Sequence, residues 1–167
     1  TVTYLYLAKN ATATVTYIDT TTGSVLYTEN LTGMLDTQSS YQTADTIVNY
    51  VKKGYVLVSD DYPTSGTIFS KDGTNYTVRL AHATDVTPET KTVTQTVHYQ
   101  DSTGKPLHAD TVNTITFTRT KVAERVTGEV TYSEWSSSKN GNAFDVVSAP
   151  NISGYQPDTT VTQAVIV

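Results

Sequence analysis

Polar and apolar residues alternate along much of this chain, and a period of two residues is typical of a β-strand that buries one face. The pattern is clearest over residues 1–7, 14–18 and 92–99, where Thr recurs beside Val, Tyr, Leu and Ile. Roughly one residue in five is Thr and 12 are Tyr, and both residue types favour the pleated surface of a sheet. The sequence therefore predicts a strand-dominated fold.

Composition excludes several classes of function. The net charge is −5 and no stretch is rich in Lys or Arg, which argues against a nucleic-acid partner. No apolar run approaches the roughly 20 residues of a membrane-spanning helix, so we expect no membrane insertion. The absence of Cys excludes thiol catalysis and cysteine metal sites. The chain begins within an alternating pattern, without Met or a signal peptide, so we expect a fragment of a longer protein.

One segment, residues 41–53, is predicted to be a helix. Its apolar residues recur at helical spacing and form one stripe: Ala44, Ile47, Val48 and Val51. Ser39 followed by Gln42 matches a capping box at the start of the helix. Gly54 stands where a helix often ends in a left-handed residue.

The first half of the chain reads as two hairpins that flank this helix. Strands are predicted over 14–18 and 25–32 before the helix, and over 55–58 and 76–82 after it. Turns are expected at 19–23 and 71–73, where Asp and Gly supply turn conformations. Two hairpins packed on one helix predict a β-grasp-like α+β module. The polar, Pro-containing stretch that follows is expected to be a linker, over residues 85–91.

The second half repeats parts of the first. Val15-Thr16-Tyr17, which precedes the Asp19 turn, recurs as Val97-His98-Tyr99 before an Asp101 turn. Gly54-Tyr55 recurs as Gly154-Tyr155, and each half is predicted to end in a strand, the second over 161–167. Self-similarity of this kind indicates a diverged internal repeat.

The middle of the second half departs from the first. Strands are predicted through residues 112–117 and 129–135, with a turn near 126–128. Residues 136–142 are expected to be a loop, and 144–147 a short strand or one helical turn. No helical stripe follows Trp135, so we expect this module to have a reduced or lost helix.

The order and spacing of these motifs resemble the mucus-binding (Mub) repeats of lactic-acid-bacterial surface adhesins. The segments that carry the resemblance are V-T-Y-I-D-T-T-T-G (15–23), T-A-D-T-I (43–47), K-G-Y-V-L-V-S-D-D-Y-P-T-S-G (53–66), F-T-R-T (117–120), V-T-G-E-V-T-Y-S-E-W (126–135) and G-Y-Q-P-D (154–158). The first half resembles the B1-type, MucBP-related module, and the second half the B2-type module. The expected division is a strand left from a preceding module, a B1-type module, a linker and a B2-type module, over residues 1–10, 11–84, 85–91 and 92–167.

The resemblance implies a β-grasp, ubiquitin-like fold in each module. It implies tandem repetition in a long extracellular protein that is anchored to the bacterial cell wall. It further implies that the partners are mucin glycoproteins and, in some relatives, immunoglobulins.

Residues that could perform catalysis or bind a metal are sparse. The three His do not have the spacing of a zinc site, and no nucleophile elbow or phosphate loop occurs, so we expect no enzyme and no cofactor. Asp60 and Asp61, and the turns at Asp19 and Asp101, offer oxygen ligands that calcium could use. The simpler interpretation, which we favour, is that these carboxylates cap their own backbone.

Two places combine an aromatic ring with polar groups, as sugar binding requires. Trp135 is one, with Tyr132 expected on the same strand and face. Tyr62 beside Asp60 and Asp61 is the other, and its position in a Pro-containing loop predicts that it is exposed. For Trp135 the alternative, which we favour, is burial in the core of the second module.

Three functions stay open on sequence alone. The first is an adhesin repeat that binds mucin glycans weakly, and whose affinity comes from many tandem copies. The second is a structural spacer that holds a distal adhesive tip away from the cell wall. The third is an immunoglobulin-binding module that uses a sheet edge or one helix face. That face carries Tyr41, Asp45, Asn49 and Lys52. We expect a monomeric fragment of a tandem array.

Overall fold

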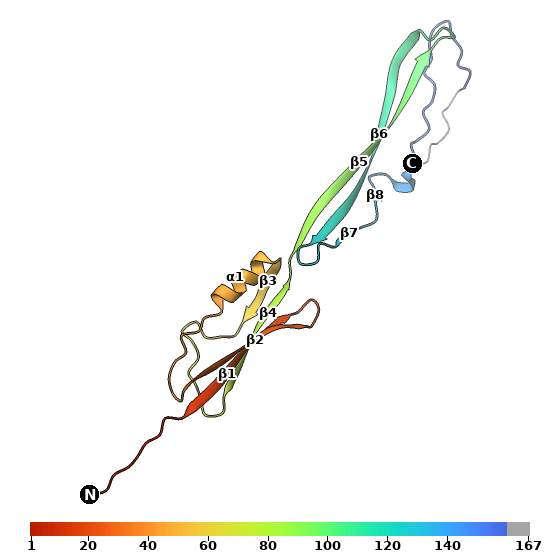
Figure 1. Ribbon diagram of the computed structural model, residues 1–167. Coiled ribbons are helices and arrows are strands. Elements are labelled where there is room, and N and C mark those ends of the chain that lie inside the picture. The colour runs from red at the N-terminus through yellow and green to blue at the C-terminus, as the bar shows by residue number, and fades with distance from the viewer. Residues whose placement is uncertain (160–167) are drawn as a thin grey trace. The chain divides into compact units, whose positions relative to one another are not determined.

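The computed structural model describes residues 1–159, which divide into two compact units. Unit 1 comprises residues 1–85 together with the short segment 123–130. Unit 2 comprises residues 86–122 together with the chain from residue 131 onward. Each unit contains its own β-sheet (Figure 1). The predicted strand over 161–167 lies outside the described residues.

Unit 1 has the predicted order of strand, strand, helix, strand and strand. These elements are β1 (Asn10–Asp19), β2 (Val25–Met34), α1 (Ala44–Lys52), β3 (Tyr55–Asp60) and β4 (Thr74–His82). The sheet order is β2-β1-β4-β3, with β1 and β4 parallel at the centre and antiparallel strands on either side. Figure 1 shows α1 beside β3. The arrangement is that of a β-grasp-like module, which confirms the predicted fold class.

The core of unit 1 follows from alternation along β1. Every second residue of β1 is buried, from Ala11 to Asp19, and the residues between them are more accessible. Tyr17 packs with Val78 and Leu80 of β4, and all three are fully buried. Burial of each large apolar side chain contributes about 1.5–3 kcal/mol, so this strip supplies much of the stability of the unit.

The start of the helix differs from prediction. Thr43 precedes α1 as its N-cap residue but makes no side-chain cap hydrogen bond, and its backbone is already helical, with φ −78° and ψ −20°. Its hydroxyl donates to Asp60 Oδ2 at 2.5 Å. Ser39 Oγ instead accepts a hydrogen bond from the Tyr41 N–H, so the predicted capping box is wrong. Gly54 adopts a φ of 101°, which confirms the left-handed residue expected after the helix.

The apolar stripe of α1 is also only partly buried. Ile47 and Tyr50 pack against the core, and the Tyr50 ring lies 5.9 Å from that of Tyr17. Val48 and Val51 are each 49% exposed. On α1 the side chains that pack against the core are therefore those of Ile47 and Tyr50, and the two valines of the predicted stripe stay half exposed.

The short segment 123–130 belongs to unit 1, although the sequence assigned it to the second module. The Arg125 N–H donates to the Ala83 carbonyl at 2.9 Å, and its guanidinium binds both carboxylate oxygens of Asp85. The backbone of Arg125 lies so close to Gly54 that a Cβ at Gly54 would be 2.7 Å from it. Glycine is therefore required at position 54 for packing as well as for its φ.

His82 contacts both this segment, at Glu124, and the end of β1, at Asp19. Its side chain is 8% exposed, its Nε2 lies 2.7 Å from Asp19 Oδ2, and its Nδ1 contacts Glu124. Burial alone would raise the pKa of Asp19, but hydrogen bonds from Thr22 and His82 and from the Thr21 N–H lower this pKa overall. The buried carboxylate therefore carries its charge in the folded unit.

Unit 2 is built on two long strands. Its elements are β5 (Thr84–Gln100), β6 (Pro106–Glu124), β7 (Val130–Tyr132), β8 (Ser136–Ser137) and a 3-10 turn (Asn140–Asn142). At the ends of the first three strands, residues 84–85, 123–124 and 130 belong to unit 1. The sheet order is β5-β6-β7, and β8 pairs with β6. Among the described residues of unit 2, the buried cluster consists of Ile115 and Phe117 on one face of β6 and Phe144 from the chain that follows the 3-10 turn. Within the described part of unit 2 the 3-10 turn is the only helical element. This agrees with the reduced or lost helix that the sequence predicted for this module.

Several local predictions are wrong. Residues 85–91, expected as a linker, lie within β5, which is at the edge of the sheet and can accommodate Pro88 on its unpaired side. Residues 1–7 form no strand, because alternation alone gives none without a pairing partner. The predicted strand over 129–135 is reduced to β7, and residues 144–147 adopt neither strand nor helical turn.

We expect Asp19→Asn to lower the free energy of unfolding of unit 1 by about 2 kcal/mol at neutral pH, because buried donors lose a charged acceptor. Hydrogen exchange of the Val78 and Leu80 amides measures this. The pKa of Asp19 is held below its ordinary value of 3.8 in the folded state, so its contribution is present above that pH. The contribution is lost as pH falls through the folded-state pKa. Equal pH dependence in the Asn variant and the parent would contradict this assignment.

A second prediction concerns the contact between Gly54 and Arg125. Gly54→Ala should destabilise unit 1 by about 2–3 kcal/mol, because strain at positive φ adds to a steric clash. The matched control is Gly23→Ala, where φ is 78° but nothing lies within 4 Å of the added Cβ. The control should cost about 1 kcal/mol. Thermal unfolding followed by circular dichroism distinguishes the two, and equal losses would show that the contact with Arg125 is unimportant.

Candidate functional site

Unit 2 carries an exposed group of two aromatic rings around one guanidinium, here called the Arg119 cluster (Glu89, Arg119, Tyr132 and Trp135). The Cζ atom of Arg119 lies 4.0 Å from the centroid of the Tyr132 ring and 4.6 Å from that of Trp135. Glu89 of β5 accepts a hydrogen bond from Arg119 Nε at 2.7 Å. The cation is therefore balanced by one carboxylate and stacked on two rings.

Backbone contacts hold the rings in place. Arg119 lies on β6 and Tyr132 ends β7, whereas Trp135 lies in the short connection between β7 and β8. At one end of that connection the Ser133 N–H donates to the Thr120 carbonyl, and the Ser133 hydroxyl accepts from the Thr120 N–H. At the other end Ser136 pairs with Thr118. Trp135 is thus fixed between two points of attachment to β6.

The expected burial of Trp135 is wrong, because the residue is 40% exposed. Ile115, Phe117 and Arg119 are at alternate positions of β6 and so share one face. The first two enter the core, which Phe144 completes. At the position of Arg119 the core ends, and the two aromatic rings cover the guanidinium instead. Tyr132 is 49% exposed.

This geometry suits an amphipathic ligand. The accessible parts of the Trp135 and Tyr132 rings offer apolar surface, and a ring stacked on a guanidinium gains about 0.5–1 kcal/mol at an exposed site. Arg119 and Glu89 add hydrogen-bonding groups at the edge of that surface, with side chains 27% and 33% exposed. A sugar ring, with one C–H face and several hydroxyls, can use both kinds of surface.

Tyr62, the other predicted sugar-contacting residue, is buried. The residue is 5% exposed, and its hydroxyl accepts a hydrogen bond from the Thr67 N–H at 3.1 Å. Its ring packs edge-on against Tyr41 and Tyr76, with centroids 5.7 and 5.1 Å away. The expected exposure is therefore wrong, because neighbouring tyrosines draw this loop ring into the core of unit 1.

Asp60 and Asp61 face their own chain. Asp60 accepts hydrogen bonds from the Thr43 hydroxyl and from the Tyr62 N–H, and Asp61 accepts one from the Thr77 N–H at 2.6 Å. Across residues 1–159 no three His, Cys, Asp or Glu side chains are grouped so that they could hold a metal ion. The carboxylates therefore act as loop caps in this structure.

The predicted helix face is mostly accessible. Asp45, Asn49 and Lys52 are exposed on α1. Tyr41 precedes the helix, is half-buried, and has its hydroxyl 2.7 Å from that of Tyr17. Tyr41 is therefore a core residue first, and the accessible face consists of the other three residues.

Arg119 and Glu89 were not among the predicted site residues. The available signal was the segment F-T-R-T, in which Arg119 comes two positions after Phe117 and so lies on the same face of a strand. A cation at an inward position of a strand needs an aromatic or acidic partner. Glu89 could not be found in this way, because the sequence placed it in a linker.

Among the described residues, no helix is long and apolar enough to cross a membrane. The family described as "Mucin binding domain" matches residues 11–82, and the family described as "Muc B2-like domain" matches residues 84–167. The comparison with curated proteins gives no match.

Two solved structures are similar over most of both chains. "Crystal structure of Mub-RV" is 34% identical with a TM-score of 0.70, and covers 93% of this chain and 89% of that chain. "Type 2 repeat of the mucus binding protein MUB from Lactobacillus reuteri" is 29% identical with a TM-score of 0.54, and covers 93% and 91%. With both domain families matched in order, this chain belongs to the family of mucus-binding (Mub) repeats.

Proposed function

We propose that this chain is a repeat of an extracellular bacterial surface adhesin that binds mucin glycans, and that the Arg119 cluster contacts the glycan. The observation that carries the proposal is the exposure of Trp135 and Tyr132 beside a charge-balanced Arg119. Family membership supports the mucin partner. The mucus-binding repeat families are not enzyme families, and the contacts of this cluster suit binding.

Weak binding by each copy is sufficient for this function. The cluster lies on an open surface, so one copy desolvates little of a ligand. If the parent protein carries the repeat in tandem, each bound copy raises the effective concentration of the next. Overall affinity then comes from the number of copies, each of which binds weakly.

Protein binding, with immunoglobulin as the partner, is a second candidate because of the exposed apolar residues on α1. Val48 and Val51 are each 49% exposed and share the helix with exposed Asn49 and Lys52. Apolar surface bordered by polar groups is typical of a protein interface. A purely structural spacer is the third candidate, and it predicts no binding even for a tandem array.

The proposed glycan contact predicts that Trp135→Ala and Tyr132→Ala each weaken binding to immobilised mucin. Loss of one aromatic contact should raise Kd by about three- to tenfold. Tyr27→Ala is the matched control, since Tyr27 of unit 1 is 45% exposed and lies outside the cluster. Binding to deglycosylated mucin should be absent. Binding that survives deglycosylation, or that Asn49→Ala with Lys52→Ala removes, would support the protein-binding candidate instead.

The role of Arg119 can be tested without a ligand, because Trp135 is the only tryptophan. Arg119→Met removes the cation but keeps a long side chain, so the indole should become more mobile and more hydrated. We expect its fluorescence emission to move to longer wavelength. The matched control, Arg79→Met on exposed β4 surface of unit 1, should leave the emission unchanged. An unchanged spectrum in Arg119→Met would show that the guanidinium does not position Trp135.

A further inference from the structure

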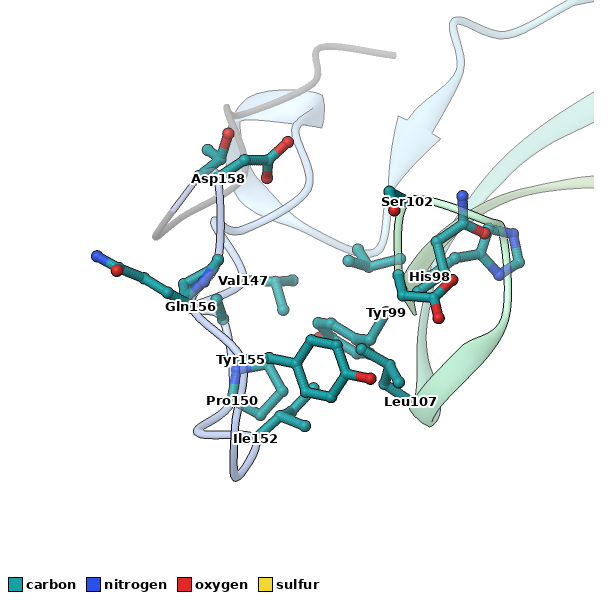
Figure 2. Close-up of a pocket in the computed structure, with 16 residues that line it drawn as sticks. His98, Tyr99, Ser102, Leu107, Val147, Pro150, Ile152, Tyr155, Gln156 and Asp158 are labelled. Atoms are coloured by element: carbon teal, nitrogen blue, oxygen red, sulfur yellow. The ribbon is translucent and has the colours of Figure 1, made fainter.

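A pocket of about 710 Å3 lies in unit 2 between the far end of the β5–β6 hairpin and the loop of residues 147–159 (Figure 2). None of the Arg119 cluster residues lines it. Its apolar lining comes from both sides: Tyr99 and Leu107 from the hairpin, and Val147, Pro150, Ile152 and Tyr155 from the loop. Figure 2 shows the Tyr155 ring lying between the loop residues and the hairpin residues.

Local turns hold both walls in place. The Tyr155 N–H donates to the Ile152 carbonyl at 3.0 Å, in a turn that Gly154 completes with a φ of 82°. This turn presents the Tyr155 ring, which is 53% exposed. On the hairpin side the Tyr99 hydroxyl lies 2.8 Å from that of Thr111, and its ring packs edge-on against His108. The pocket thus has one fixed ring and one accessible ring.

The polar lining has an acidic balance. Asp101 and Asp158 line the pocket together with His98 and Ser102, and the lining contributed by residues 1–159 contains no Lys or Arg. Hydrogen bonds from the Thr103 hydroxyl and from the Lys105 N–H lower the pKa of Asp101, so this carboxylate is ionised at neutral pH. The Nδ1 atom of His98 lies 3.0 Å from Oδ2 of Asp110. Such a pocket repels anions and offers hydrogen-bond acceptors to hydroxyl groups.

We propose that this pocket binds an uncharged sugar residue, with the ring of Tyr155 against the C–H face of the sugar and Asp101, Asp158 and Ser102 bonded to its hydroxyls. The inference rests on the proposed function and deepens it by naming the substrate class of a second contact surface. The volume is within the range of about 300–1,000 Å3 that is typical of small-ligand sites. A purely apolar ligand would remove water from the carboxylates of Asp101 and Asp158 without giving them new hydrogen bonds, and an acidic sugar would be opposed by their charge.

The test is a titration of the intact chain, followed by the backbone amide signals in two-dimensional NMR. The neutral probes are galactose and N-acetylglucosamine, and the acidic probe is N-acetylneuraminic acid. We expect the neutral probes to shift the signals of Tyr99, Ser102 and Tyr155, and the acidic probe to shift them much less. Tyr155→Ala should raise Kd for the neutral probes about tenfold, and Tyr155→Phe should restore binding because the ring is kept.

Tyr6→Ala is the control for loss of an exposed tyrosine, since Tyr6 is 88% exposed in unit 1. Unchanged amide signals of Ile115 and Phe117 would show that the Tyr155 variants keep the core of unit 2. Shifts confined to Tyr132 and Trp135 would overturn the pocket proposal and leave the proposed function standing. Equal binding of the acidic probe, or no shift with either neutral probe, would also overturn it. In Trp135→Ala, the neutral probes could still shift the signals of the pocket residues while binding to mucin is unchanged. That result would overturn the role of the Arg119 cluster and leave the pocket proposal standing.

Discussion

The parallel pairing of β1 with β4 is the constraint on which unit 1 depends. These two strands are far apart in the sequence and yet form the centre of the sheet, so all the intervening elements must return the chain to β1. A parallel pair needs a crossover connection, and here the connection contains β2, α1 and β3. The buried strip of Tyr17, Val78 and Leu80 supplies the free energy that offsets the closure of this long loop.

Within its described residues, unit 2 buries fewer apolar side chains than unit 1 does. The buried cluster in this part of unit 2 has three residues, and the two long strands of the sheet extend well beyond them. Surface that the core cannot fill is left to the Arg119 cluster on one side and to the pocket beside Tyr155 on the other. A sheet with so small a core therefore leaves aromatic side chains accessible, and accessible aromatics are what a carbohydrate-binding surface needs.

Sequence patterns predicted the elements better than they predicted burial. The order of unit 1, the helix and the turns at Asp19 and Asp101 follow from local rules of periodicity and turn chemistry, and all are present. Tyr62 was predicted to be exposed and Trp135 to be buried, and both predictions are wrong. Burial depends on contacts with residues that are distant in the sequence, which local patterns do not reveal. The prediction of a linker over residues 85–91 failed for a related reason. A polar edge strand is stabilised by pairing with the neighbouring strand, and its own residues give little indication of a strand.

The contribution of residues 123–130 to unit 1 bears on how such repeats can be divided. The two family matches meet between residues 82 and 84, which suggests a clean cut between two independent pieces. A piece that stops there would keep His82 but lose Glu124, and it would leave Gly54 without the backbone of Arg125 beside it. Residues 123–130, which lie within the Muc B2-like match, therefore form part of the same compact unit as the mucin-binding domain. Duplication or recombination that keeps the two domains together preserves these contacts, whereas exchange of either domain alone breaks them.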